Sequence, residues 1–198
     1  KVYLFIIICC VTFSLYSFET YLTLQKINFE EEISNKKIEI YKKLSGKNFD
    51  TRNKFEFFKD SIKKNKNITL RVSPSFFLNE NKNLSPFSGL SNSETINCNE
   101  MGYYAVYQSD RYGFNNPDAE WDLQKVEYLI VGDSFVHGAC VNRPNDIGSV
   151  LRKLSNQPVL NLAYSNNGPL LEYATLREYL KPNVKNFLFV YYEGNDFN

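Results

Sequence analysis

Residues 126–141 decide the fold, and they read Val-Glu-Tyr-Leu-Ile-Val-Gly-Asp-Ser-Phe-Val-His-Gly-Ala-Cys-Val. The first part of this stretch is β-branched, aromatic or aliphatic and ends at Gly132, as expected for a strand that is buried on both faces. Ser134 follows at once, so its hydroxyl would lie at the carboxyl edge of a sheet. Because ligands bind at that edge in open α/β sheets, Ser134 is a candidate nucleophile.

The residues after Ser134 alternate between helical and strand-like patterns. Apolar positions at helical spacing predict helices over 145–155 and 168–180, and short apolar runs predict strands over 158–163 and 187–192. This alternation is typical of a parallel sheet with right-handed crossovers. We therefore expect an α/β domain over residues 69–198.

Two short motifs resemble the conserved blocks of the SGNH (GDSL-type) hydrolases. Gly132-Asp133-Ser134 is similar to the first block, and Gly194-Asn195-Asp196, behind the apolar run 186–192, is similar to a short form of the third block. The resemblance covers about residues 126–198 and points to a membrane-anchored bacterial branch of the family. It implies a three-layer, flavodoxin-like parallel sheet and cleavage of an ester by a serine nucleophile, without a cofactor.

The resemblance also implies three donors for an oxyanion. The first is the backbone N–H of Ser134, and the third is the side-chain amide of Asn195. The second is a backbone N–H in the loop 164–169, where the family has a glycine. Counting from the preceding strand, that glycine falls on Asn166, and Gly168 lies two residues beyond, so both remain candidates. Supporting roles fall to the motif residues Gly132, Asp133, Gly194 and Asp196.

The general base is not found in these 198 residues. The family takes it from a later Asp-x-x-His block, and no such block is present here. His137 is the only histidine, but a base on the same turn as Ser134 would approach the hydroxyl poorly. We interpret His137 as a structural or supporting residue. We also expect the chain to be an inactive fragment that lacks the catalytic histidine.

The amino-terminal stretch is apolar and the next stretch is charged. Residues 2–18 contain no charged residue, and the apolar character continues to Leu24, which is near the length of a membrane span. A cleaved signal peptide would end in small residues, whereas residues 18–21 are bulky. We expect residues 1–24 to form a single-pass membrane anchor with the domain outside the cytoplasm. The charged residues 25–68 are expected to form a helical stalk.

Composition excludes some functions. The net charge is +1 and 23% of the residues are charged, so there is no concentrated basic face for nucleic acid. A single histidine and scattered cysteines give no metal-ligand spacing. Outside the cytosol Cys98 and Cys140 can form a disulfide, and the alternative is two separate thiols.

Two functions remain open. The leading hypothesis is a serine esterase or acyl (acetyl) transferase that acts on an ester, with acylated surface glycan or lipid as the expected substrate. The alternative is a non-catalytic α/β module that binds a glycan or a partner at the same sheet edge. The loop 110–122, rich in Gly, Asn and Asp, either walls the active site or is a purely structural turn.

Overall fold

The computed structural model describes residues 1–77 and 85–194. The chain divides into two compact units, Lys1–Phe49 and Asp50–Asn198. Together they form a mixed α/β chain with a long apolar helix at its amino terminus and small sheets that contain parallel strands, as expected in outline from the sequence.

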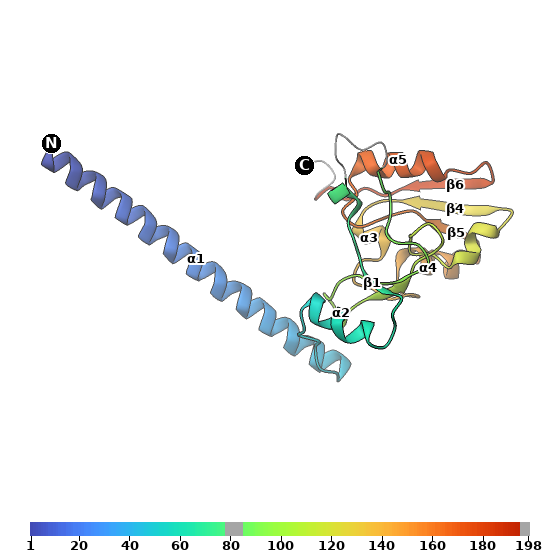
Figure 1. Ribbon diagram of the computed structural model, residues 1–198, viewed down its shortest axis with the longest axis horizontal. Helices are drawn as coiled ribbons and strands as arrows, with labels where there is room; N and C mark the ends of the chain where they lie inside the picture. Colours follow the sequence, from blue (N-terminus) through green and yellow to red (C-terminus); the bar gives the residue numbers. More distant parts are fainter. Residues whose placement is uncertain (78–84, 195–198) are drawn as a thin grey trace. The chain divides into compact units, whose positions relative to one another are not determined.

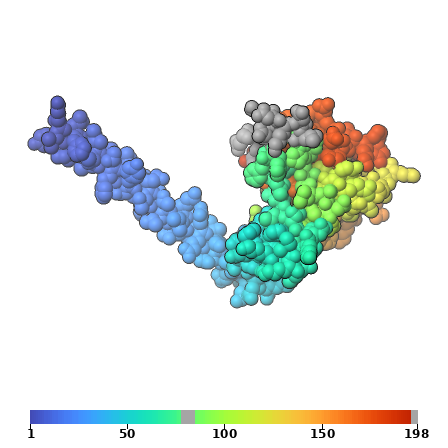
Figure 2. Space-filling view, in the orientation of Figure 1, coloured from blue at the N-terminus to red at the C-terminus, as the bar shows by residue number. Residues whose placement is uncertain are grey.

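The first unit is dominated by one helix, α1 (Val2–Ser45), which is continuous over its 44 residues (Figure 1). Its apolar part is long enough to cross a membrane, and the side chains of that part are not buried by any other element (Figure 2). At 1.5 Å per residue the helix is about 66 Å long, roughly twice the hydrocarbon core of a bilayer. The predicted anchor and the first part of the predicted stalk are therefore one helix, which ends where Gly46 adopts a φ of 67°.

The second unit begins at Asp50, earlier than the boundary at residue 69 that the sequence predicts. Helix α2 (Lys54–Ile62) therefore belongs to the compact unit, and its Phe57 ring stacks on Tyr104 with 4.4 Å between the ring centroids. A capping box formed by Asn53 and Glu56 starts the helix. A small sheet follows, in which β1 pairs in parallel with β2 and β2 pairs antiparallel with β3: β1 (Ile68–Leu70), β2 (Glu94–Ile96) and β3 (Val106–Gln108).

The second sheet is fully parallel and has the order β5-β4-β6. Its strands and the short helices around it are β4 (Val126–Val131), β5 (Val159–Asn161), β6 (Val184–Phe189), α3 (Ser134–His137), α4 (Ile147–Ser155), α5 (Pro169–Tyr179) and two 3-10 helices, η1 (Pro74–Phe77) and η2 (Asp118–Asp122). The next strand along the chain, β5, pairs with one edge of the central strand β4, and β6 then pairs with its other edge. In sheets of this order the ligand crevice lies beyond the carboxyl ends of the two strands that flank the reversal, here β4 and β6.

Helices cover both faces of the parallel sheet (Figure 1). Leu129 and Val131 point to one face, where Leu176 of α5 packs against their cluster. Ile130 points to the other face, where Leu151 of α4 packs. This two-sided burial explains why β4 is apolar at successive positions rather than at alternate ones.

Candidate functional site

Ser134 is the first residue of α3 and follows β4 through a tight turn. Gly132 makes this turn possible, because a Cβ atom there would lie 2.7 Å from Val136 Cγ2 and 2.9 Å from the Val190 carbonyl oxygen. Asp133 caps the helix by accepting a 2.9 Å hydrogen bond from the Phe135 N–H. The serine is partly exposed, in contrast to the buried glycine and aspartate before it.

Two buried asparagines fix α3 by donating hydrogen bonds to its last backbone carbonyls. Asn115 Nδ2 donates to the His137 carbonyl at 3.0 Å, and Asn161 Nδ2 donates to the Val136 carbonyl at 2.6 Å. The last carbonyls of any helix lack partners within it, and in a one-turn helix such external donors fix the position of the whole turn. The Ser134 turn is therefore held by the loop before β4 and by the end of β5.

His137 is fully buried and faces the loop that follows β5. Its ring stacks on Tyr164 with 4.7 Å between the centroids, and Nδ1 accepts the Ser165 N–H at 3.3 Å and lies 2.8 Å from Ser165 Oγ. Burial, with a smaller contribution from the Arg71 charge, lowers the pKa of His137 to about 3. The imidazole is therefore neutral at physiological pH and ties α3 to the next loop, which supports a structural role.

A pocket of about 300 Å³, lined by both polar and apolar residues, opens at Ser134, and its volume is at the small end of the range of ligand sites. Ser165 and Asn166 line it from the loop after β5, and the Cys98–Cys140 pair lines it from the other side. The charged residues in its wall are Arg71 and Glu100. The pocket thus brings together segments that are far apart in the sequence.

Of the two candidates for the second oxyanion donor, one lines the pocket and the other does not. Asn166 lines the pocket and has a φ of 69°, a conformation that asparagine tolerates better than most residues. Arg71 Nη1 holds this loop by donating to Asn166 Oδ1 at 3.1 Å and to the Ser165 carbonyl at 3.3 Å. Gly168 is not in the pocket wall. It has an extended backbone and caps α5. The structure therefore brings Asn166, and not Gly168, to Ser134.

Cys98 and Cys140 are joined by a disulfide, with 4.8 Å between their Cα atoms. The bond links the loop after β2 to the segment after α3, so it crosses the wall of the pocket. It is the first of the two alternatives that the sequence leaves open.

The third motif is described only in part. Gly194 follows the segment after β6, while Asn195 and Asp196 lie outside the described residues. Within residues 1–77 and 85–194, no group of His, Cys, Asp and Glu side chains is suited to hold a metal ion.

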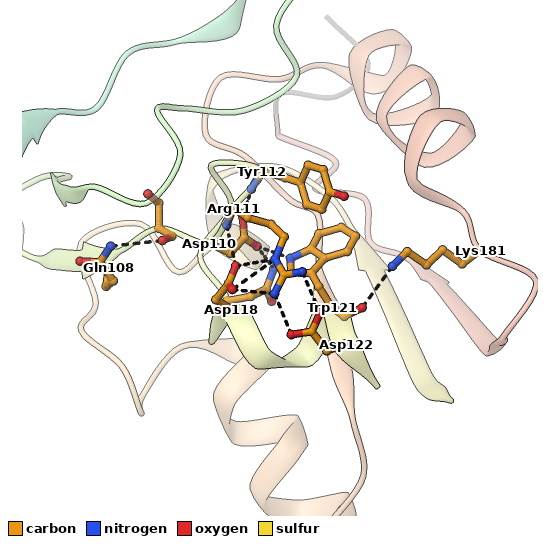
Figure 3. Close-up of polar contacts among 10 residues, drawn as sticks. Gln108, Asp110, Arg111, Tyr112, Asp118, Trp121, Asp122 and Lys181 are labelled. Carbon is orange, nitrogen blue, oxygen red and sulfur yellow. Dashed lines mark hydrogen bonds and ion pairs between the residues drawn. The ribbon is translucent and has the colours of Figure 1, made fainter. Parts of the chain in front are cut away.

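The loop 110–122 is held together by a network of polar contacts (Figure 3). Asp110 is buried and accepts hydrogen bonds from two backbone N–H groups of the loop, from Asn116 and, at 2.8 Å, from Trp121 Nε1. Burial raises the pKa of Asp110, and these four donors oppose that rise. Arg111 lies between Asp118 and Asp122 and forms an ion pair with each of them. None of these groups lines the pocket, which favours the structural alternative for this loop.

Sequence reasoning did not single out Arg71 or Glu100. Arg71 directly follows the three-residue strand β1, and only its charge at a strand end could have marked it. Compared with protein-family models, curated protein sequences and solved structures, the chain gives no match.

Proposed function

We propose that this chain is part of a membrane-anchored serine esterase or acyl transferase of the SGNH type. The observation that carries the proposal is the position of Ser134. It begins a helix at the carboxyl end of the central strand, in a parallel sheet of order β5-β4-β6, and shares a pocket with the left-handed Asn166. The three-layer flavodoxin-like fold of that family has the same order in its first three strands.

In the proposed reaction Ser134 Oγ attacks the carbonyl carbon of an ester. The negative charge that develops on the carbonyl oxygen is stabilised by the backbone N–H groups of Ser134 and Asn166, with the Asn195 amide as the third proposed donor. The alcohol leaves with a proton, and the acyl group on the serine passes to water in a hydrolase or to another hydroxyl in a transferase.

The proposed general base lies outside these 198 residues. His137 is the only histidine in the sequence, and its Nδ1 is engaged by Ser165 in a buried site with a pKa of about 3. An imidazole in this environment cannot hold the serine proton at neutral pH. We therefore expect residues 1–198 alone to be inactive towards esters.

The proposed location is the outer side of a membrane. A single candidate spanning helix near the amino terminus is compatible with anchoring through residues 1–24. The Cys98–Cys140 disulfide supports an oxidising compartment, the periplasm or the cell surface, because stable disulfides are rare in the cytosol. We propose acylated or acetylated glycan or lipid of the cell surface as the substrate class.

The alternative function, a non-catalytic module that binds a glycan or a partner at the same pocket, is favoured by one observation. Within the described ranges 1–77 and 85–194 no histidine lines the pocket of Ser134. A module of this kind would use the pocket without needing a proton acceptor there.

Covalent labelling tests the two functions directly. The protein from the complete gene is treated with a fluorophosphonate as wild type, as Ser134→Ala and as the control Ser155→Ala, whose serine at the end of α4 does not line the pocket. We expect labelling of the wild type and of the control but not of Ser134→Ala. A folded wild type that is not labelled would contradict the esterase and favour the binding module.

A further inference from the structure

The pocket contains a positive charge that the fold leaves uncompensated. Among the residues that the structure describes, the Arg71 guanidinium makes no ion pair with a carboxylate, and its hydrogen bonds go to the Ser165 carbonyl and the Asn166 side chain. Glu100 lies in the same pocket wall but is exposed and forms no ion pair with Arg71 in this part of the chain. A partly buried guanidinium without an anionic partner is costly for a fold to maintain.

A second cation increases this excess. Lys54, the first residue of α2, is half-buried and does not itself line the pocket, and its burial together with repulsion by the Arg71 charge lowers its pKa to about 8. Two cations that repel each other are stabilised by an anion between or beside them. The positive charge of Arg71 in the pocket wall, with Lys54 near it outside the wall, favours a ligand with negative charge over a neutral one.

The geometry of Arg71 leaves part of its fork available. Nη1 donates to both acceptors of the 165–166 loop, Nε is buried without a partner, and no acceptor for Nη2 is found in residues 1–77 and 85–194. Because the guanidinium is held through Nη1 and its Nε is buried, the group that it presents to the pocket in a set direction is Nη2. Carboxylates and phosphates match such a planar donor better than a hydroxyl does.

We infer that the pocket binds an anionic group, a carboxylate or a phosphate, at Arg71, beside the position of the reacting ester at Ser134. The ester part of this inference rests on the proposed function, and the anion site does not. The substrate class would then be an acylated molecule whose ester lies close to a carboxylate or phosphate, such as an acidic sugar or a phosphate-containing lipid or polymer.

The test measures binding rather than catalysis. Chain 1–198 in detergent is titrated with inorganic phosphate and with glucuronate, and methyl glucoside serves as the neutral probe, while the backbone amide resonances of residues 165–166 report occupancy. We expect saturable binding of at least one anion at about millimolar concentration and none of the neutral sugar. The tighter anion identifies the source, because phosphate points to phosphate-containing polymers and glucuronate to acidic glycans.

Variants assign the site to Arg71. Arg71→Gln should weaken anion binding at least about tenfold, and Arg71→Lys should weaken it less, because lysine keeps the charge but loses the fork. The control Arg177→Gln removes a positive charge on α5, outside the pocket, and should change nothing. Unaltered binding by an Arg71→Gln chain that keeps the native fluorescence of Trp121 would overturn the inference, as would a wild type that binds neither anion.

The two proposals fail separately. If Ser134 is not labelled by fluorophosphonate but phosphate binds in an Arg71-dependent way, the esterase is wrong and the anion site stands. If Ser134 is labelled but no anion binds, the esterase stands and the anionic substrate class is wrong.

Discussion

His137 shows how a single residue can look catalytic in the sequence and serve the fold instead. Three positions after a candidate nucleophile, it is placed where a base would be sought, yet it is buried between the rings of Tyr164 and Tyr107. The Ser165 backbone N–H donates to Nδ1, and among residues 1–77 and 85–194 no carboxylate pairs with the ring to stabilise an imidazolium. The imidazole is therefore neutral in the folded protein, and its protonation is coupled to unfolding.

That coupling predicts a dependence of stability on pH. The folded pKa of His137, about 3, lies below the unfolded value of about 6.5, so unfolding takes up a proton between these two pH values. The free energy of unfolding should fall as the pH drops below 6.5, by at most about 1.4 kcal/mol per pH unit. His137→Phe keeps the ring and removes the titration, so its stability should fall less steeply. Urea unfolding at pH 7.5 and 4.5, followed by the fluorescence of Trp121, measures both slopes, and equal slopes would contradict the assignment.

Gly132 is a second residue whose identity is fixed by its neighbours. Gly132→Ser would push a Cβ atom against Val136 and the Val190 carbonyl and should cost about 2 kcal/mol of stability. Gly168→Ser is the matched control, because nothing lies within 4 Å of a Cβ atom there and serine is a good helix cap. The control should be neutral to within about 0.5 kcal/mol. Equal losses in the two variants would show that the turn after β4 has room for a side chain.

At the scale of elements, the sequence predicts best where contacts are local. The helices and strands expected at 145–155, 158–163, 168–180 and 187–192 correspond to α4, β5, α5 and β6, with their ends shifted by a few residues. Local patterns also mark Gly132 and Ser134, because fewer than ten residues of sequence are enough to recognise an apolar strand that ends in glycine and is followed by a serine. The predicted site residues that lie outside the described part, Asn195 and Asp196, remain predictions.

The rest of the site depends on contacts that no local pattern contains. The bond from Arg71 to Asn166 spans 95 positions, and β1 and β2 are too short to show a strand pattern and pair across residues that are far apart. The network of Asp110 with Asn116 and Trp121 lies within one loop, and the composition of that loop predicts a turn but not these particular bonds. The long-range bond from Arg71 to Asn166 helps to hold the loop that lines the pocket with Ser134.

The disulfide links two such elements, and its removal has a calculable effect. It closes a loop between residues 42 positions apart, so its loss should lower the free energy of unfolding by as much as about 4 kcal/mol in the chain-entropy picture. The double variant Cys98→Ala/Cys140→Ala should show this loss in urea unfolding monitored by Trp121. Cys9→Ala/Cys10→Ala is the control, since these free cysteines lie in α1. A loss below about 1 kcal/mol would mean that the conformations of the unfolded chain are already restricted when the disulfide is absent.

At the scale of the whole molecule, α1 joins an apolar segment to a charged one without a break. The apolar part suits the hydrocarbon core of a membrane, and the later turns carry ion pairs such as Lys36–Glu32 that suit water. Because α1 has no break between its apolar and charged parts, the chain has no hinge at the membrane surface. The charged turns would therefore extend out of the bilayer as a rod.

The membrane interpretation predicts the effect of charges placed along this helix. Ile7→Lys together with Val11→Lys should release the chain from membranes, because each lysine near the centre of a span costs about 2.5–3.5 kcal/mol. The control pair, Ile33→Lys with Ile40→Lys, lies in the charged part and should leave the chain in the membrane fraction after alkaline extraction. If both pairs remain membrane-bound, an attachment other than the apolar part of α1 is required.

The side of the membrane on which the compact unit lies can be read from its cysteines. If the unit is outside the cytoplasm, Cys98 and Cys140 are oxidised in intact cells, whereas in the cytosol they would be kept as thiols. Rapid acid quenching, alkylation with a heavy maleimide and gel electrophoresis should therefore show a Cys9→Ala/Cys10→Ala chain with no modified cysteine before reduction and two after it. A protease added to intact cells (or, behind an outer membrane, to spheroplasts) should remove the unit under the same conditions. Two reactive thiols without reduction would place the unit in the cytoplasm, where the proposed substrates on the cell surface could not reach Ser134.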